Sequence, residues 1–423
     1  MPAGWDAEVV GRLARASSSA AADGRDVIFI GRDDRRVRAL AGALSFFAPQ
    51  AEQVSFPAWD CLPYDRLPPH ADIAGRRVEA LARLLGAGAT GSTGGGRVIL
   101  TTVAAAGQMV PPRDFFRGAS LEVLSGGRLD PADLIKFLAA NGYARVAMVM
   151  EPGEYAVRGG IIDVFAPGSG APARLDFFAD QVETLRLFDP ESQRTTGETA
   201  ALRLQPVSEV LLNAAAIERF RTRYRELFGS GEKDPLYEAV SSGRRRPGME
   251  HWLPLFHQTM ETIFDYATAA TVVLDIQADE ALEARLDLIA EYYAARVEVM
   301  NRAGNRAGDW ASGAEKGGDP YRPLPPQRLY LDRAAWDSLL VDISRRRGVI
   351  EMTSFDQPPA SAAATVAVVD LGGRPGADFA AARVAPEINL FDALAERIGE
   401  QQKAGLRVVV AGVSEGSLDR LAG

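Results

Sequence analysis

The sequence is poor in the residues that build disulfides and metal sites. It has one cysteine, Cys61, and three histidines, His70, His251 and His257. A single cysteine excludes an intramolecular disulfide and fits a reducing compartment. One cysteine with three histidines cannot form a standard structural zinc site. We therefore expect a cytoplasmic protein with no metal site.

Long apolar runs and excess positive charge are also missing. No stretch approaches eighteen uninterrupted apolar residues, and Asp6 lies close to the amino end, so neither a membrane span nor a secretory signal is expected. The net charge is −9, which argues against a dedicated nucleic-acid clamp, because such domains are usually strongly basic. The chain has no Gly-Lys dipeptide, so it lacks the standard phosphate-binding loop G-x-x-x-x-G-K-[ST].

What is present is the composition of an ordinary globular protein, with 47% hydrophobic and 24% charged residues. A chain of 423 residues is long enough for roughly three domains. In residues 1–118 strands alternate with helices, which predicts an α/β domain with a mainly parallel sheet. The expected strands are 26–30, 54–56 and 97–102, and the expected helices are 34–47 and 72–85.

The pattern changes at residue 119. Residues 119–206 mix short strands with one helix and predict a small α+β domain, inserted between two halves of the α/β domain. Residues 329–423 predict a further small α/β domain, with strands at 366–369 and 406–411. We expect both chain ends to be truncated, because each falls within a helical pattern. The predicted segments are 1–118, 119–206, 207–328 and 329–423.

The most informative stretch runs from Arg158 to Asp189 and reads RGGIIDVFAPGSGAPARLDFFADQVETLRLFD. Two turns, APGSG and ADQ, separate three segments rich in β-branched and aromatic residues. This arrangement predicts a three-stranded antiparallel meander. The expected strands are 161–165, 174–178 and 182–188.

The two faces of this meander differ. Side chains alternate along a strand, so Leu175 and Phe177 share one face. Arg174, Asp176 and Phe178 share the other. Arg158 enters the same region from the turn before the first strand. One interpretation is a second layer over this face, with Phe178 in a core. The other is an open interface, since protein interfaces enrich arginine and aromatic residues.

These residues resemble the UvrA-binding domain shared by bacterial transcription-repair coupling factors and the excinuclease subunit UvrB. The pattern R-G-x-(apolar)2-D-(apolar)-F, a turn, and then R-(apolar)-(D/E)-F-F is typical of that family. The resemblance favours the open interface. The resemblance runs through the whole chain, in FPAWDCLPYDRLPP (56–69), RVILTTVAAAGQMVPP (97–112), DPLYEAV (234–240) and PGMEHWLPLF (247–256).

The resemblance implies a degenerate P-loop NTPase-like parallel-sheet domain, similar to UvrB domain 1, with an inserted α+β UvrA-binding domain and a further small α/β domain. The place that matches the phosphate loop of UvrB contains Gly4, Trp5 and Asp6 but no lysine. Asp6 would put a negative charge where phosphate requires a positive one. We therefore expect no catalytic residues and no cofactor in this chain. In the family, ATP and Mg belong to later motor domains.

The function implied is recruitment of UvrA, in nucleotide excision repair, to stalled RNA polymerase by a protein-interaction module without its own ATPase. Arg158, Arg174 and Phe178 match the positions that the family uses for UvrA contact. RNA polymerase and double-stranded DNA would bind domains absent here. In full-length family members a carboxyl-terminal domain would mask the UvrA-binding surface.

The alternative is a nucleotide-binding ATPase or a UvrB-like damage-verification subunit. The missing Gly-Lys dipeptide argues against the ATPase. The stretch between Asp65 and Asp72 is too short for the long aromatic hairpin with which UvrB enters DNA, which argues against damage verification.

Overall fold

The chain, as a computed structural model, is a mixed α/β structure with a parallel sheet and packed helices, as the sequence predicts. It divides into two compact units, residues 6–356 and a unit that combines residues 1–5 with 357–423. Among the described residues no helix is long and apolar enough to cross a membrane. The structure describes residues 4–18, 26–85, 96–117, 119–231, 234–304, 321–353, 379–380, 389–409 and 416.

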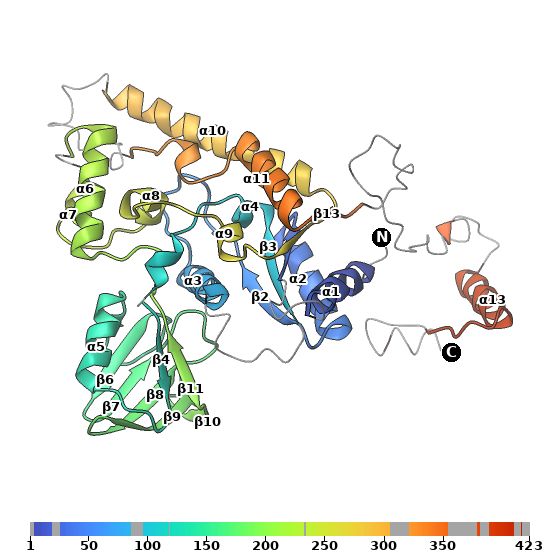
Figure 1. The fold of residues 1–423 in the computed structure, drawn as a ribbon, viewed down its shortest axis with the longest axis horizontal. Coiled ribbons are helices and arrows are strands. Elements are labelled where there is room, and N and C mark those ends of the chain that lie inside the picture. The colour runs from blue at the N-terminus through green and yellow to red at the C-terminus, as the bar shows by residue number, and fades with distance from the viewer. Residues whose placement is uncertain are drawn as a thin grey trace. The chain divides into compact units, whose positions relative to one another are not determined.

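A five-stranded parallel sheet organises the larger unit (Figure 1). Its strands follow the order β13-β12-β1-β3-β2, and every neighbouring pair is parallel. The parallel sheet expected from residues 1–118 is therefore confirmed, and strands from much later in the chain complete it. The strands are β1 (Val27–Gly31), β2 (Glu52–Phe56), β3 (Arg97–Thr102), β12 (Thr271–Leu274) and β13 (Val349–Glu351).

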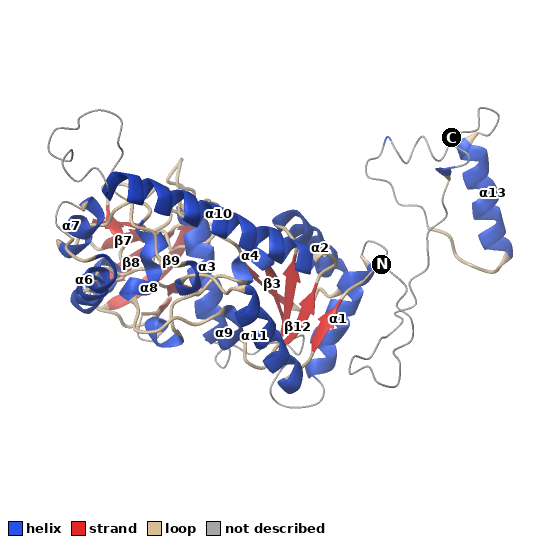
Figure 2. Ribbon diagram, turned by 90° about the horizontal axis from the view of Figure 1, so that it is seen from above, coloured by secondary structure: helices blue, strands red, loops and turns tan. Residues whose placement is uncertain are grey.

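Helices cover both faces of this sheet, with α1 and α11 on opposite sides (Figure 2). Val27 and Phe29 of β1 pack toward α1 and α2, while Ile28 and Ile30 pack toward the other helices. Burial on both faces explains why β1 is an uninterrupted apolar run. The helices are α1 (Trp5–Ser18), α2 (Asp34–Phe47), α3 (Ala71–Leu85), α4 (Val103–Ala106), α9 (Ile263–Tyr266), α10 (Ala278–Gly304) and α11 (Arg333–Arg346).

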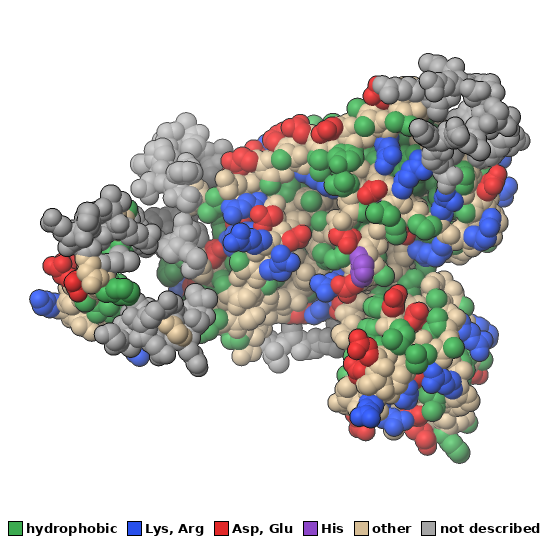
Figure 3. Space-filling model, turned by 180° about the vertical axis from the view of Figure 1, so that it is seen from behind, with side chains coloured by type: hydrophobic (Ala, Val, Ile, Leu, Met, Phe, Trp, Pro, Cys, Tyr) green, Lys and Arg blue, Asp and Glu red, His purple; other side chains and the backbone are tan. Residues whose placement is uncertain are grey.

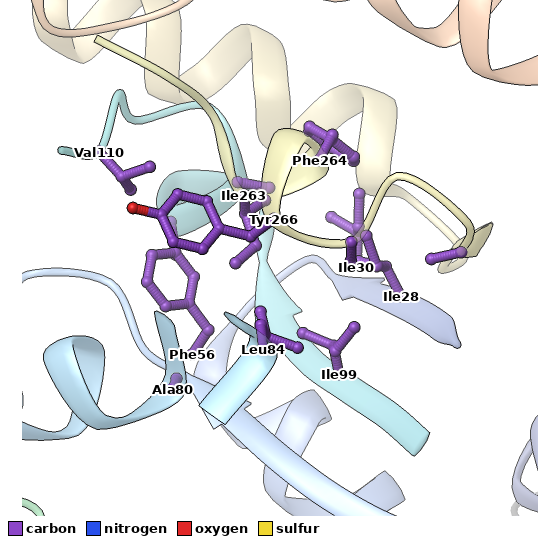
Figure 4. Packing of buried hydrophobic residues seen from close by; sticks show 14 of the residues in the cluster. Ile28, Ile30, Phe56, Ala80, Leu84, Ile99, Val110, Ile263, Phe264 and Tyr266 are labelled. Atoms are coloured by element: carbon purple, nitrogen blue, oxygen red, sulfur yellow. The ribbon is translucent and has the colours of Figure 1, made fainter. Parts of the chain in front are cut away.

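The larger of the two cores lies on the face covered by α3 and α9. Phe56, Leu84 and Ile99 lie below Ile263 and Tyr266 in this core (Figure 4). The Tyr266 hydroxyl donates a hydrogen bond to the backbone oxygen of residue 111 at 2.7 Å, so its polar atom is satisfied inside the apolar cluster. Burial raises the pKa of Tyr266 and keeps it neutral.

Residues 121–204 lie between β3 and β12 in the sequence and form two further sheets. The larger has the order β10-β9-β8-β7-β6-β5, and only its β5–β6 pair is parallel. The predicted meander is confirmed as β7-β8-β9. The strands are β4 (Leu121–Leu124), β5 (Ala144–Arg145), β6 (Glu154–Arg158), β7 (Ile161–Val164), β8 (Ala173–Phe178), β9 (Gln181–Phe188), β10 (Thr195–Glu198) and β11 (Ala201–Leu204), with β4 and β11 paired separately.

Helix α5 (Pro131–Ala140) covers one side of the six-stranded sheet, which we call the inner face. Leu134 and Leu138 of α5 share a core with Leu175 and Leu185 of the sheet. Asp130 caps the helix by accepting a hydrogen bond from the Ala132 N–H at 2.7 Å. Proline at the first helical position lacks only an N–H that would have no partner there.

A helical layer follows β11 and builds its own core with the loop after β2. Phe220 and Phe256 stack in it at a ring-centroid distance of 4.9 Å. The helices are α6 (Ala214–Phe228), α7 (Pro235–Ser241) and α8 (Leu253–Phe256). Within the described ranges, the short 3-10 helices are Arg113–Phe116, Met249–Trp252 and Pro326–Arg328.

A buried ion pair joins α3 to the segment that follows β11, where the chain leaves the two sheets of residues 121–204. Arg77 and Glu209 are both almost inaccessible to solvent. Arg77 Nε and Nη2 each donate to a Glu209 carboxylate oxygen at 3.1 Å, and Nη1 donates to the Pro57 oxygen at 2.9 Å. Trp59 Nε1 donates to the same carboxylate at 3.1 Å, and His257 Nε2 lies 2.8 Å from the Glu209 backbone oxygen.

The smaller unit contributes helix α13 (Leu390–Lys403), which Asn389 caps by accepting from the Phe391 N–H at 2.9 Å. The strand expected at 366–369 lies outside the described residues. Of the strand expected at 406–411, residues 406–409 are described and are not a strand, so that prediction is wrong there. The proposed division into four segments stays a prediction.

Arg77→Met is expected to lower the free energy of unfolding by about 3–5 kcal/mol, because Glu209 would keep a buried carboxylate without its cation. Adding Glu209→Leu should recover much of this loss, since an apolar pair can replace a buried ion pair. Urea unfolding monitored by circular dichroism measures both variants. An undiminished loss in the double variant would contradict the assignment to the ion pair.

Candidate protein-interaction face

The side of β6–β9 opposite α5, which we call the outer face, carries a network of charged side chains. Pairing between the strands places these residues in two adjacent rows across the sheet. The row nearer the Phe178 end holds Arg158, Ile161, Asp176 and Thr184, and the next row holds Ala156, Asp163, Arg174 and Arg186.

Asp163 holds the Arg174 guanidinium in place within this network. Its Nε and Nη2 donate to the two Asp163 carboxylate oxygens at 2.7 and 2.9 Å, and its guanidinium lies 4.7 Å from the centre of the Phe188 ring. The Asp163 side chain is only 2% exposed. The hydrogen bond to this carboxylate, with its charge, raises the pKa of Arg174. Arg174 is therefore held in one orientation by the sheet itself.

Asp176 holds the Arg186 guanidinium in the same way as Asp163 holds that of Arg174. The Arg186 guanidinium forms an ion pair with the Asp176 carboxylate, and the Thr184 hydroxyl donates to that carboxylate at 2.6 Å. Arg174 and Arg186 are directly opposite each other on β8 and β9, where like charges repel. The two aspartates offset this repulsion, because each lies beside one of the guanidiniums.

Arg158 differs from the other two arginines. It is exposed at the end of β6, and its Nη2 donates to the Ala147 backbone oxygen at 2.7 Å. Among the described residues no carboxylate forms an ion pair with it. Arg158 is thus the guanidinium of the outer face that has most donors left for an external acceptor.

Phe178 lies in the open at the end of β8, where its side chain is 71% exposed. Leu175 is fully buried and Phe177 packs against the inner core, so the predicted alternation of faces is confirmed. The interpretation that buries Phe178 in a second core is wrong. An exposed phenylalanine leaves apolar surface that burial against a partner would stabilise.

The rest of the outer face is covered by residues 146–150. Val146 and Val149 of this segment pack on Ala156, Phe165 and Phe188, which project from the same side of the sheet. The second layer that the sequence left open therefore exists, but it covers only the end of the face away from Phe178. On the side of the molecule seen in Figure 3, basic, acidic and apolar side chains are interspersed over this group of strands.

The place that matches a phosphate loop has a different structure. Gly4 has a positive φ of 92°, and Trp5 begins α1. Asp6 is buried and pairs with Arg36, whose Nε also donates to Asp275 at 3.0 Å. Burial raises the pKa of Asp275, and the positive charge of Arg36 partly offsets this rise. One guanidinium is thus shared by two carboxylates beside the carboxyl ends of β1 and β12.

Sequence reasoning identified Arg158, Arg174 and Phe178, and the structure brings all three to one face. It also assigned Asp176 to that face, and it missed Asp163 and Arg186 as parts of it. The signal was available, because these residues have the same alternation parity as Arg174 once the strands are paired.

Comparisons with known proteins agree with this location. Residues 121–209 match the family described as the UvrB interaction domain. The chain is 34% identical to the transcription-repair-coupling factor of Haemophilus influenzae over 303 residues, 71% of this chain and 24% of that protein. It is 36% identical to that of Escherichia coli over 309 residues, 72% of this chain and 24% of that protein.

A third relative, the transcription-repair-coupling factor of Rickettsia prowazekii, is 30% identical over 315 residues, 74% of this chain and 26% of that protein. The chain thus spans about a quarter of the length of these relatives. The matched part is their amino-terminal region. The chain has the sequence features of transcription-coupled DNA repair proteins.

Arg174→Ala is expected to lower the free energy of unfolding by about 2–4 kcal/mol, because Asp163 would remain buried without its cation. Arg158→Ala should change it by less than about 0.5 kcal/mol, since Arg158 is exposed. Urea unfolding measures the stability of Arg174→Ala, of Arg158→Ala, and of the double variant Arg174→Ala with Asp163→Asn. Equal stability of the two single variants would contradict the structural role of Arg174.

Proposed function

We propose that this chain, which matches the amino-terminal region of transcription-repair-coupling factors, recruits the nucleotide excision repair protein UvrA to stalled RNA polymerase. The surface that would bind UvrA is the outer face of the six-stranded sheet. The observation that carries the proposal is Phe178, exposed at the same end of the sheet as Arg158 within the segment that matches the UvrB interaction domain.

The geometry suggests a division of labour between the two arginines. Arg158 would make charge-assisted hydrogen bonds to UvrA carboxylates, because no carboxylate among the described residues occupies it. Arg174 has its Nε and Nη2 engaged by Asp163, so it would offer chiefly its Nη1 group, in a fixed orientation. Phe178 would enter an apolar pocket of the partner as an anchor.

The finer description of the fold belongs to this proposal. Residues 119–206 would be a UvrA-binding domain inserted into a degenerate P-loop NTPase-like domain. The chain would be no enzyme and would hold no cofactor. Supporting this, Arg36 is bonded to Asp6 and Asp275, and two carboxylates disfavour a bound phosphate at that position.

The other partners would act through parts of the full-length relatives outside the match. We propose that RNA polymerase and DNA bind there, that ATP and Mg serve a motor there, and that a carboxyl-terminal domain masks the outer face until the motor engages. The isolated chain should therefore bind UvrA without further activation.

Isothermal titration of the chain with purified bacterial UvrA tests the recruitment. Arg158→Ala and Phe178→Ala are each expected to cost about 2–4 kcal/mol of binding free energy, as interface hot spots do. Neither side chain is needed for the sheet, so the fold should stay intact. Arg174→Ala is a poorer probe, because it also removes the partner of Asp163.

Two matched controls exist. Phe46 is an exposed phenylalanine on α2, at 80% exposure, and Arg117 is an exposed arginine outside the matched segment. Phe46→Ala and Arg117→Ala should bind UvrA as the unchanged chain does. Losses of the same size in the controls would move the interface away from the outer face, and no binding by the unchanged chain would refute recruitment.

The alternative ATPase is tested by thermal unfolding with and without Mg-ATP. A nucleotide at 100 times its dissociation constant would stabilise the chain by about 2.7 kcal/mol. We expect Mg-ATP to cause no shift in the Tm of the unchanged chain. It should also cause none in the Tm of Arg36→Ala, because that variant leaves the two carboxylates of Asp6 and Asp275 at the same place. A clear upward shift in the unchanged chain would establish nucleotide binding instead.

A further inference from the structure

The segment 146–150 turns two methionines away from the sheet that it covers. Its Val146 and Val149 point onto the sheet, whereas Met148 and Met150 are 47% and 40% exposed. We call these two side chains the methionine ridge. Because the segment lies on the outer face, the ridge is raised above the same face that carries Arg158 and Phe178.

The segment is held in place by polar bonds at three points. The Glu154 carboxylate accepts from the Met150 and Glu151 N–H groups at 2.8 and 2.9 Å. Gln193 donates to the Val149 oxygen at 3.1 Å, and Arg158 donates to the Ala147 oxygen at 2.7 Å. Ordering the ridge on binding would therefore cost little backbone entropy, since its backbone is already fixed.

Arg158 connects the ridge to the charged rows. Its guanidinium bonds the residue next to Met148, so a partner carboxylate at Arg158 would come close to the ridge. A carboxylate that binds the remaining donors of Arg158 leaves the bond to Ala147 in place, because a guanidinium has five N–H donors.

We propose that the methionine ridge is a second apolar contact for the acidic protein partner that binds Arg158. The inference rests on the proposed function and extends its surface from Phe178 across to residue 150. Methionine is flexible and polarizable and is enriched at protein interfaces, where it adapts to irregular apolar surfaces. The partner would thus present carboxylates between two apolar patches, one for Phe178 and one for the ridge.

The test compares two double variants of the whole chain by calorimetric titration with UvrA. Met148→Gln with Met150→Gln keeps the length of the side chains but makes them polar, and should weaken Kd by about tenfold. Met148→Leu with Met150→Leu keeps them apolar and should leave Kd within about twofold. Both should unfold at the Tm of the unchanged chain, because the ridge is exposed.

Each outcome bears on a different claim. If Arg158→Ala weakens binding but both double variants bind as the unchanged chain does, the ridge contact is refuted and recruitment stands. Equal weakening by glutamine and leucine would also refute it, since apolar character would then not matter. If the unchanged chain does not bind UvrA, the proposed function fails, and the ridge inference fails with it.

Discussion

The position of the outer face depends on the ion pair between Arg77 and Glu209. Taking both charges out of water is costly. The pair offsets that cost with a bidentate geometry, a hydrogen bond that Trp59 donates to Glu209, and one that Arg77 donates to the Pro57 oxygen. The Arg77 guanidinium also lies 4.4 Å from the centre of the Phe56 ring. Since Glu209 ends the segment that matches the UvrB interaction domain, the pair fixes the carboxyl end of that segment against α3.

Close packing completes the same junction. A Cβ atom on Gly75 of α3 would lie 2.7 Å from Pro167, and one on Gly168 would lie 2.5 Å from Glu79. Gly168 also has a φ of +77°, which side chains rarely allow. These contacts come from the turn between β7 and β8. The turns at the opposite end of those strands carry Arg158 and Phe178, so both residues lie at the end of the sheet away from α3.

The sequence predicted those features that depend on residues close together in the chain. Turn residues and β-branched runs gave the meander, and alternation placed Phe178 opposite Leu175. It did not reach contacts that depend on how distant segments pack. Arg77 and Glu209 are 132 residues apart, and Arg36 reaches Asp275 across 239. The cover by residues 146–150 was open for the same reason, since alternation shows that a face exists but not what lies on it.

The aspartates of the outer face determine how its arginines would meet the carboxylates of a partner. The chain has a net charge of −9, so its overall field would not attract a partner's carboxylates over a long distance. Asp163 and Asp176 reduce the field of the face further, but they hold Arg174 and Arg186 in single orientations. An ordered guanidinium loses less rotamer entropy on binding than a free one. Under the proposed function, recognition on this face would rely on prearranged donors and apolar anchors. Its affinity should then vary less with ionic strength than that of an unpaired basic patch.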